Sequence, residues 1–246
     1  MAKHFRSGDA SHLPNQRKPG AIGPPDELPR QRRGTTPQMY GRYPDWDVLS
    51  QQDHWDVVTR NVVLDRIHNV PPFRFFDEHE QRTLGAFCDR VTAQDKEPRI
   101  AVLNFVDRKL HEGELDGYQF AGMPDDRDVW RIVARGLDET AGEAGGHDFA
   151  SLSEEAQRQI VGRMANGELE GGAWEELDVS KAWSVVTRHV LAAFYSHPWA
   201  WNEIGFGGPA YPRGYAALGV DTKEHWEPEP AFDVDPVTDT QERGLE

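Results

Sequence analysis

The sequence of 246 residues predicts an all-α fold: an irregular bundle of about six helices, followed by an ordered, extended segment rich in glycine, proline and aromatic residues. Three observations support this. Between about residues 48 and 195, apolar residues recur at the i, i+3, i+4, i+7 spacing of a buried helix face. Serine or aspartate precedes most of these stretches, and proline or glycine follows several of them. No alternating apolar–polar stretch is long enough to indicate a strand.

The first two helices are expected on either side of a pair of prolines. The first would begin at Ser50 and run to about Asn69 before Pro71-Pro72 stops it. Its inward residues would be Trp55, Val58, Val62 and Ile67. The second is expected at Asp77, which precedes Glu80 by the spacing of a capping box. Its core positions would be Leu84, Phe87, Cys88 and Val91.

Four further helices follow the same pattern. The third is expected from Arg99 to Leu110, and the fourth opens at Asp125 or Asp126. Their expected core residues are Ile100, Leu103, Val106 and Leu110, then Val129, Ile132, Val133 and Leu137. For the fifth, Ser151 and Glu154 form a second candidate capping box. Its core would be Ile160, Val161 and Met164, with Asn166-Gly167 at its end.

The sixth helix is expected to begin at Ser180 as its cap and to end before Pro198. Its inward residues would be Trp183, Val186, Val190 and Phe194. After Tyr195 the composition changes, because residues 197–219 hold many glycines and prolines together with five Trp, Phe and Tyr residues. Such a stretch is too aromatic to remain in water, so we expect it to be ordered and extended on the helices or on another protein.

Charge and composition divide the chain into three parts. The net charge is −15, of which the first fifty residues carry +3 and residues 221–246 carry −7. We expect residues 1–47 to be an N-terminal arm that is disordered or wraps a partner, because they hold many prolines and few bulky apolar residues. Residues 48–220 would be the helical domain, and 221–246 an acidic tail.

Several function classes are disfavoured by the sequence. An acidic chain is poorly suited to bind nucleic acid, and no apolar run reaches the ~18–20 residues of a membrane span. The single cysteine, Cys88, excludes an internal disulfide, an iron–sulfur cluster and a Cys-based zinc site. The ten histidines lack the spacing of a metal site, and no G-x-S-x-G nucleophile elbow occurs. The Gly205–Gly208 run lacks the lysine of a phosphate-binding loop. We therefore predict no catalytic, cofactor or metal site on this chain.

The aromatic segment is the main candidate for binding. Trp, Tyr and Arg are enriched at the centres of protein interfaces. We expect a partner interface formed by Trp199, Trp201, Asn202, Glu203, Phe206, Tyr211, Arg213 and Tyr215. The alternative is a free-standing carbohydrate-binding protein, because Trp and Tyr faces also stack on sugar rings. A third hypothesis is an independent metalloenzyme.

Several stretches resemble the gluconate 2-dehydrogenase subunit 3 family. They are Phe75–Glu80, Leu84, Phe87–Val91, Asp107–Leu110, Phe149–Ser153 and, most specifically, Phe194–Tyr215. The members of this family are small accessory subunits of flavin-dependent dehydrogenases of the glucose–methanol–choline type. The resemblance spans about residues 70–220.

The resemblance implies a non-catalytic helical subunit whose large partner binds FAD and oxidises a sugar, sugar acid or polyol. A cytochrome subunit is a further partner in some complexes of the family. Exported members typically begin with a twin-arginine signal. Here no apolar stretch follows Arg32-Arg33, so we expect a cytoplasmic protein, with export alongside a partner as the alternative.

Overall fold

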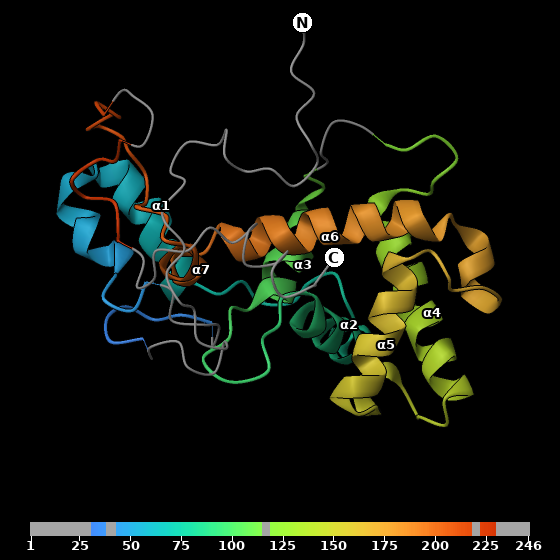
Figure 1. The fold of residues 1–246 in the computed structure, drawn as a ribbon. Helices are drawn as coiled ribbons and strands as arrows, with labels where there is room; N and C mark the ends of the chain where they lie inside the picture. The colour runs from blue at the N-terminus through green and yellow to red at the C-terminus, as the bar shows by residue number, and fades with distance from the viewer. Residues whose placement is uncertain (1–30, 38–42, 115–118, 218–221, 230–246) are drawn as a thin grey trace, which may run out of the picture. The chain divides into compact units, whose positions relative to one another are not determined.

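The computed structural model of the chain describes residues 31–37, 43–114, 119–217 and 222–229 (Figure 1). These residues form seven α-helices and three short 3-10 helices, and they contain no strand, which confirms the all-α prediction. None of the described helices combines the length and the apolar character that a membrane crossing needs. The chain divides into two compact units, described separately below: unit 1 holds the residues up to Val62 and those from Pro198 onward, and unit 2 holds Val63–His197.

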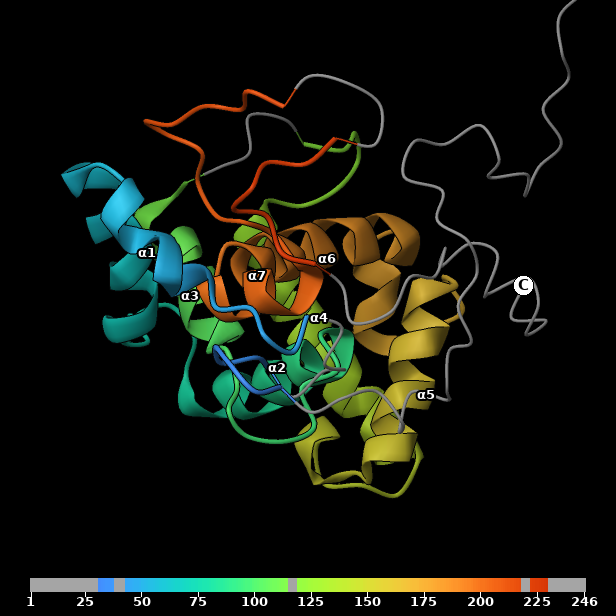
Figure 2. The same cartoon turned by 60° about the vertical axis from the view of Figure 1, so that its left-hand side comes forward.

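Unit 2 contains five complete α-helices. They are α2 (Glu78–Val91), α3 (Val102–Glu112), α4 (Asp126–Glu143), α5 (Glu154–Ala165) and α6 (Val179–Tyr195), with the 3-10 helices η3 (Phe149–Ser151) and η4 (Gly172–Glu176) between them. Helix α6, drawn in orange, passes beside α3 and α4 in both Figure 1 and Figure 2, and it also contacts α5. Helix α2 contacts α3, α4 and α5. The core of unit 2 therefore lies where α2 and α6 meet the other three helices.

The start of α2 confirms the sequence prediction in detail. The Asp77 carboxylate accepts the N–H groups of His79 and Glu80, and the Glu80 side chain accepts the Asp77 N–H, so the capping box is complete. Within α2, Leu84, Phe87 and Cys88 are buried. All predicted core residues of α3 and α4 are buried as well: Ile100, Leu103, Val106, Leu110, Val129, Ile132, Val133 and Leu137.

Three helix starts in unit 2 differ from prediction. Helix α3 begins at Val102 instead of Arg99. Helix α5 is capped by Ser153, because Ser151 instead completes a capping box with Asp148 around η3. Helix α6 is capped by Asp178 rather than Ser180, since the Asp178 carboxylate accepts the Lys181 N–H. For α5 and α6 a neighbouring residue is the cap, whereas the N-cap of α3, Ala101, makes no side-chain hydrogen bond. Shifts of this size are usual for helix boundaries.

A buried carboxylate holds the backbone that leads into α2. Asp107 of α3 is fully buried, and its two oxygens accept the backbone N–H groups of Arg74, Phe75 and Phe76 at 2.8–3.0 Å. Hydrogen bonds of backbone donors to a charged acceptor are stronger than neutral ones. Asp107 therefore explains why the Phe75-Phe76 pair and the Asp107–Leu110 stretch, far apart in sequence, belong to one structural feature.

Unit 1 shows that the predicted single helix from Ser50 to Asn69 is wrong. The chain instead forms the 3-10 helix η2 (Val48–His54), capped by Asp47, and then α1 (Val57–His68), whose first six residues lie in unit 1. Trp55 separates the two in an extended conformation and is buried. The Asp56 carboxylate accepts the Thr59 N–H at 2.8 Å and so starts α1 anew.

Candidate functional site: the aromatic segment of unit 1

The aromatic segment begins as a helix. Residues 198–204 form the short helix α7 (Pro198–Ile204), so the expectation of an extended segment after Tyr195 is wrong for its first part. Three of the predicted site residues on this helix are buried: Trp201 is 6% exposed, Asn202 1% and Glu203 4%, while Trp199 is half-buried. In the chain taken alone, α7 is thus a packing element of unit 1.

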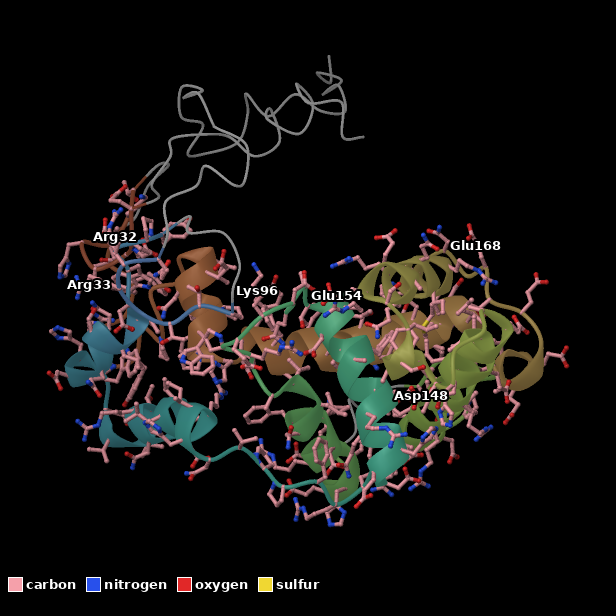
Figure 3. All side chains as sticks on the ribbon, turned by 90° about the horizontal axis from the view of Figure 1, so that it is seen from below. Arg32, Arg33, Lys96, Asp148, Glu154 and Glu168 are labelled. Carbon is pink, nitrogen blue, oxygen red and sulfur yellow. The ribbon has the colours of Figure 1, made fainter. Side chains whose placement is uncertain are left out.

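Asn202 ties the N-terminal residues of unit 1 to α7. Its Oδ1 accepts the Val48 N–H at 2.8 Å, and its Nδ2 donates to the Thr35 carbonyl at 2.9 Å. Next to this contact, the N–H groups of Arg32 and Arg33, labelled in Figure 3, both donate to the Pro44 carbonyl. Residues 31–37 and 43–47 therefore pack into unit 1, whereas the rest of the predicted N-terminal arm lies outside the described residues.

Glycines allow the chain to turn closely around aromatic rings after α7. Gly205 has φ +70°, and a Cβ atom there would lie 2.3 Å from the ring of Tyr43. Gly208 has φ +84°, and a Cβ atom there would meet Trp55 and Val48 at 2.8 Å. Both positions require glycine on conformational and on steric grounds. Packing against aromatic rings thus explains Gly205 and Gly208.

Arg213 organises the end of the segment. Its guanidinium lies over the ring of Trp226 at 4.0 Å, and its Nη1 donates to Gln51 Oε1 at 2.9 Å. Tyr215 also contacts Trp226, with 5.5 Å between ring centroids. Burial lowers the pKa of Arg213, and burial together with the charge of Glu227 raises the pKa of Tyr215, so Tyr215 stays neutral. These contacts hold Tyr215 in a defined position at the surface.

Exposed apolar side chains are concentrated in unit 1. Ten large hydrophobic side chains are exposed among the described residues, and seven of them belong to unit 1, which holds fewer than a third of those residues. The seven are Val57, Val58, Val62, Ile204, Phe206, Tyr211 and Tyr215. Clustered exposed apolar surface marks interaction sites more often than isolated residues do. Unit 1 therefore exposes more large apolar side chains for its size than unit 2 does.

The exposure of the valines of α1 was not predicted from the sequence. Val58 and Val62 were expected to face the core, but they are 70% and 50% exposed, and Val63 is the buried residue of this helix. Helix α1 has β-branched residues at adjacent positions, so no single apolar stripe distinguishes its inner face. The sequence signal that was available is the pairing of Val57-Val58 and Val62-Val63, separated by three polar residues of which Arg60 is charged.

Metal-ligand clusters and the single cysteine are two features of the described residues that bear on catalysis. No group of three or more His, Cys, Asp or Glu side chains among them could hold a metal ion. Cys88 is buried in α2, and burial raises the pKa of its thiol far above the ordinary value, so a thiolate nucleophile is disfavoured.

Comparison with protein families identifies the chain. The family model described as gluconate 2-dehydrogenase subunit 3 matches residues 78–208, which is 131 of the 246 residues. The chain belongs to this family. Searches of curated proteins and of solved structures gave no match. The matched region of this family member covers α2–α7 and ends at Gly208, so α1 and the segment carrying Tyr211 and Tyr215 lie outside it.

Proposed function

We propose that this protein is the non-catalytic accessory subunit of an FAD-dependent oxidoreductase, which it binds and stabilises. The large subunit would be of the glucose–methanol–choline type and would oxidise CH–OH groups of sugars, sugar acids or polyols. FAD would be held by that partner and no cofactor by this chain. Membership of a dehydrogenase subunit family supports a multi-subunit complex. The observation that carries the proposal on this chain is the concentration of exposed apolar side chains in unit 1.

The interface that we propose has an inner and an outer set of residues. Trp201, Asn202 and Glu203 are buried and shape unit 1 from within. Phe206, Tyr211 and Tyr215 are 37%, 65% and 55% exposed and can contact the partner directly. Tyrosine suits this role, since it buries a large ring at a small entropy cost and its hydroxyl finds polar partners. Half-exposed Trp199 and Arg213 would lie at the edge of the contact.

Two substitutions distinguish the outer residues, which would contact the partner, from the inner residues, which support the fold of unit 1. Tyr211→Ala should weaken binding of the flavoprotein by about 2 kcal/mol, roughly thirtyfold in Kd, and leave the melting temperature of the isolated chain unchanged. Trp201→Ala should lower that melting temperature, because it removes a buried ring packed against Phe206 at 5.3 Å. Tyr195→Ala is the matched control, since Tyr195 is an exposed tyrosine of unit 2. Binding is measured by titrating the purified flavoprotein.

The proposal fails if the flavoprotein is soluble and fully active without this chain and does not bind it. Calorimetry of the isolated chain with aldoses and aldonates is a second check. Saturable sugar binding without the flavoprotein would favour the alternative of a free-standing carbohydrate-binding protein.

A further inference from the structure

Unit 2 has an open groove that the family assignment leaves without a role. It lies between α2, α5 and α6 and has a volume of about 490 Å³. Its walls are mostly apolar, with Val91, Val161, Ala165, Trp183 and Leu191 among them. Leu191 is 40% exposed. The volume falls within the ~300–1,000 Å³ range of sites that bind ligands, so the groove has room for an apolar group.

A glycine of α5 lines this groove. Gly162 lies within α5, and a Cβ atom built on it meets nothing within 4 Å. Glycine inside a helix costs about 0.5–1 kcal/mol relative to alanine. Nothing in the described part of the chain needs the small size of Gly162. A side chain introduced there would point into free space rather than into the protein, which makes the position a clean test site.

Arg90, which also lines the groove, has a buried guanidinium with an unused donor. The Arg90 side chain is only 4% exposed, and its Nη1 lies 2.8 Å from Asp95 and 3.2 Å from Glu154. Its Nε–H is buried and has no hydrogen-bond acceptor within the part of the chain that the structure describes. A buried donor without an acceptor costs free energy, so an acceptor supplied from outside would be stabilised at this position.

The charges around Arg90 indicate which acceptor fits. Arg158 lies 3.3 Å from Asp95 and 3.1 Å from Glu154, so the two arginines share two carboxylates, and Glu155 adds a third at 3.8 Å from Arg158. Three negative charges against two positive ones would repel a further carboxylate. A neutral carbonyl oxygen is therefore the complementary group. An apolar side chain next to a neutral carbonyl is what a peptide segment presents.

We propose that the α2–α5–α6 groove receives a segment of the large subunit, with one apolar side chain over Gly162 and a backbone carbonyl directed to Arg90. This inference rests on the proposed function and adds a second contact region to it, in unit 2. All the residues that line the groove lie within residues 78–208, the range matched by the subunit family.

The test uses the full chain and the FAD-containing protein purified from its complex. Gly162→Leu should fill the groove and weaken binding at least about tenfold, with no loss of thermal stability of the isolated chain. Gly85→Leu is the matched control, because Gly85 lies within α2 and also has no atom within 4 Å of a built Cβ. It should leave binding within about twofold. Arg90→Lys, which keeps the charge but removes the Nε–H, should also weaken binding, by about fivefold or more.

The outcomes separate this inference from the function on which it rests. If the wild-type chain binds the flavoprotein and Gly162→Leu binds equally well, the groove inference is overturned and the proposed function stands. If the wild-type chain does not bind, both are overturned. Native mass spectrometry and light scattering of the isolated chain test other occupants. A bound small molecule or a dimer that Gly162→Leu abolishes would also overturn the assignment to the large subunit.

Discussion

The bridge made by Asn202 is the feature of the candidate site that can be perturbed most sharply. Its side chain is 1% exposed and joins two backbone groups, the Val48 N–H and the Thr35 carbonyl, from segments 154 and 167 residues away. Asn202→Ala leaves both groups without this partner. Each buried unsatisfied group costs about 1–3 kcal/mol, and the partly buried Thr35 carbonyl belongs at the lower end. We expect unit 1 to lose about 2–4 kcal/mol.

Hydrogen exchange at the Val48 amide measures this loss locally. In Asn202→Ala we expect the amide to exchange at least about tenfold faster, since 1.4 kcal/mol corresponds to a factor of ten. Asn202→Asp keeps an acceptor for Val48 but loses the donor to Thr35, so its Val48 exchange should lie between wild type and alanine. Asn61→Ala, an exposed asparagine of α1, is the control. Unchanged Val48 exchange in Asn202→Ala would refute the bridging role.

Three further predictions concern stability. Asp107→Ala should lower the free energy of unfolding, measured in urea, by at least about 3 kcal/mol, because three backbone donors lose their acceptor. Glu112 is exposed on the same helix, so Glu112→Gln should cost under about 1 kcal/mol. Equal losses in the two variants would contradict the role given to Asp107. Burial lowers the pKa of His197 from 6.5 to about 4. The neutral imidazole therefore contributes fully to stability above pH 6.5, and up to about 3 kcal/mol of stability is lost as the pH falls to 4. His197→Gln should flatten that part of the pH profile of stability, and an unchanged slope would count against this role of His197. In thermal unfolding, Gly205→Ala should lower stability by at least about 2 kcal/mol, because it combines a positive φ with a clash against a tyrosine ring. Gly122→Ala has a positive φ but free space around the new Cβ atom, so it should lower stability by less. The reverse order would exclude the steric explanation.

The helices of unit 2 were predictable because their signals are local. The capping box of Asp77 and Glu80 and the spacing of Leu84 and Phe87 lie within one stretch of chain, and both are found as expected. The errors in this unit were the start of α3 and the caps of α5 and α6. In addition, Val91, Val161 and Trp183 were expected in the core but are only half-buried. Packing between helices followed from the apolar faces that these patterns define.

Unit 1 was less predictable because it is assembled from distant segments. Nothing near Val48 in the sequence indicates that its N–H will bind Asn202, and nothing near Gln51 indicates Arg213. The same long-range contacts explain why Trp55 interrupts a helix that local periodicity favoured. The eight predicted interface residues do share one segment and one unit, but which of them meet a partner stays a prediction.

The central claim is that this chain holds and stabilises an FAD-containing partner. The most direct measurement is size-exclusion chromatography with light scattering on the co-expressed chain and flavoprotein, with the FAD absorbance followed across the elution. The account predicts a single yellow complex containing both chains in fixed stoichiometry, and loss of soluble, FAD-loaded flavoprotein when this chain is omitted. Separate elution of the two proteins, with the flavoprotein equally soluble, loaded and active alone, would contradict it.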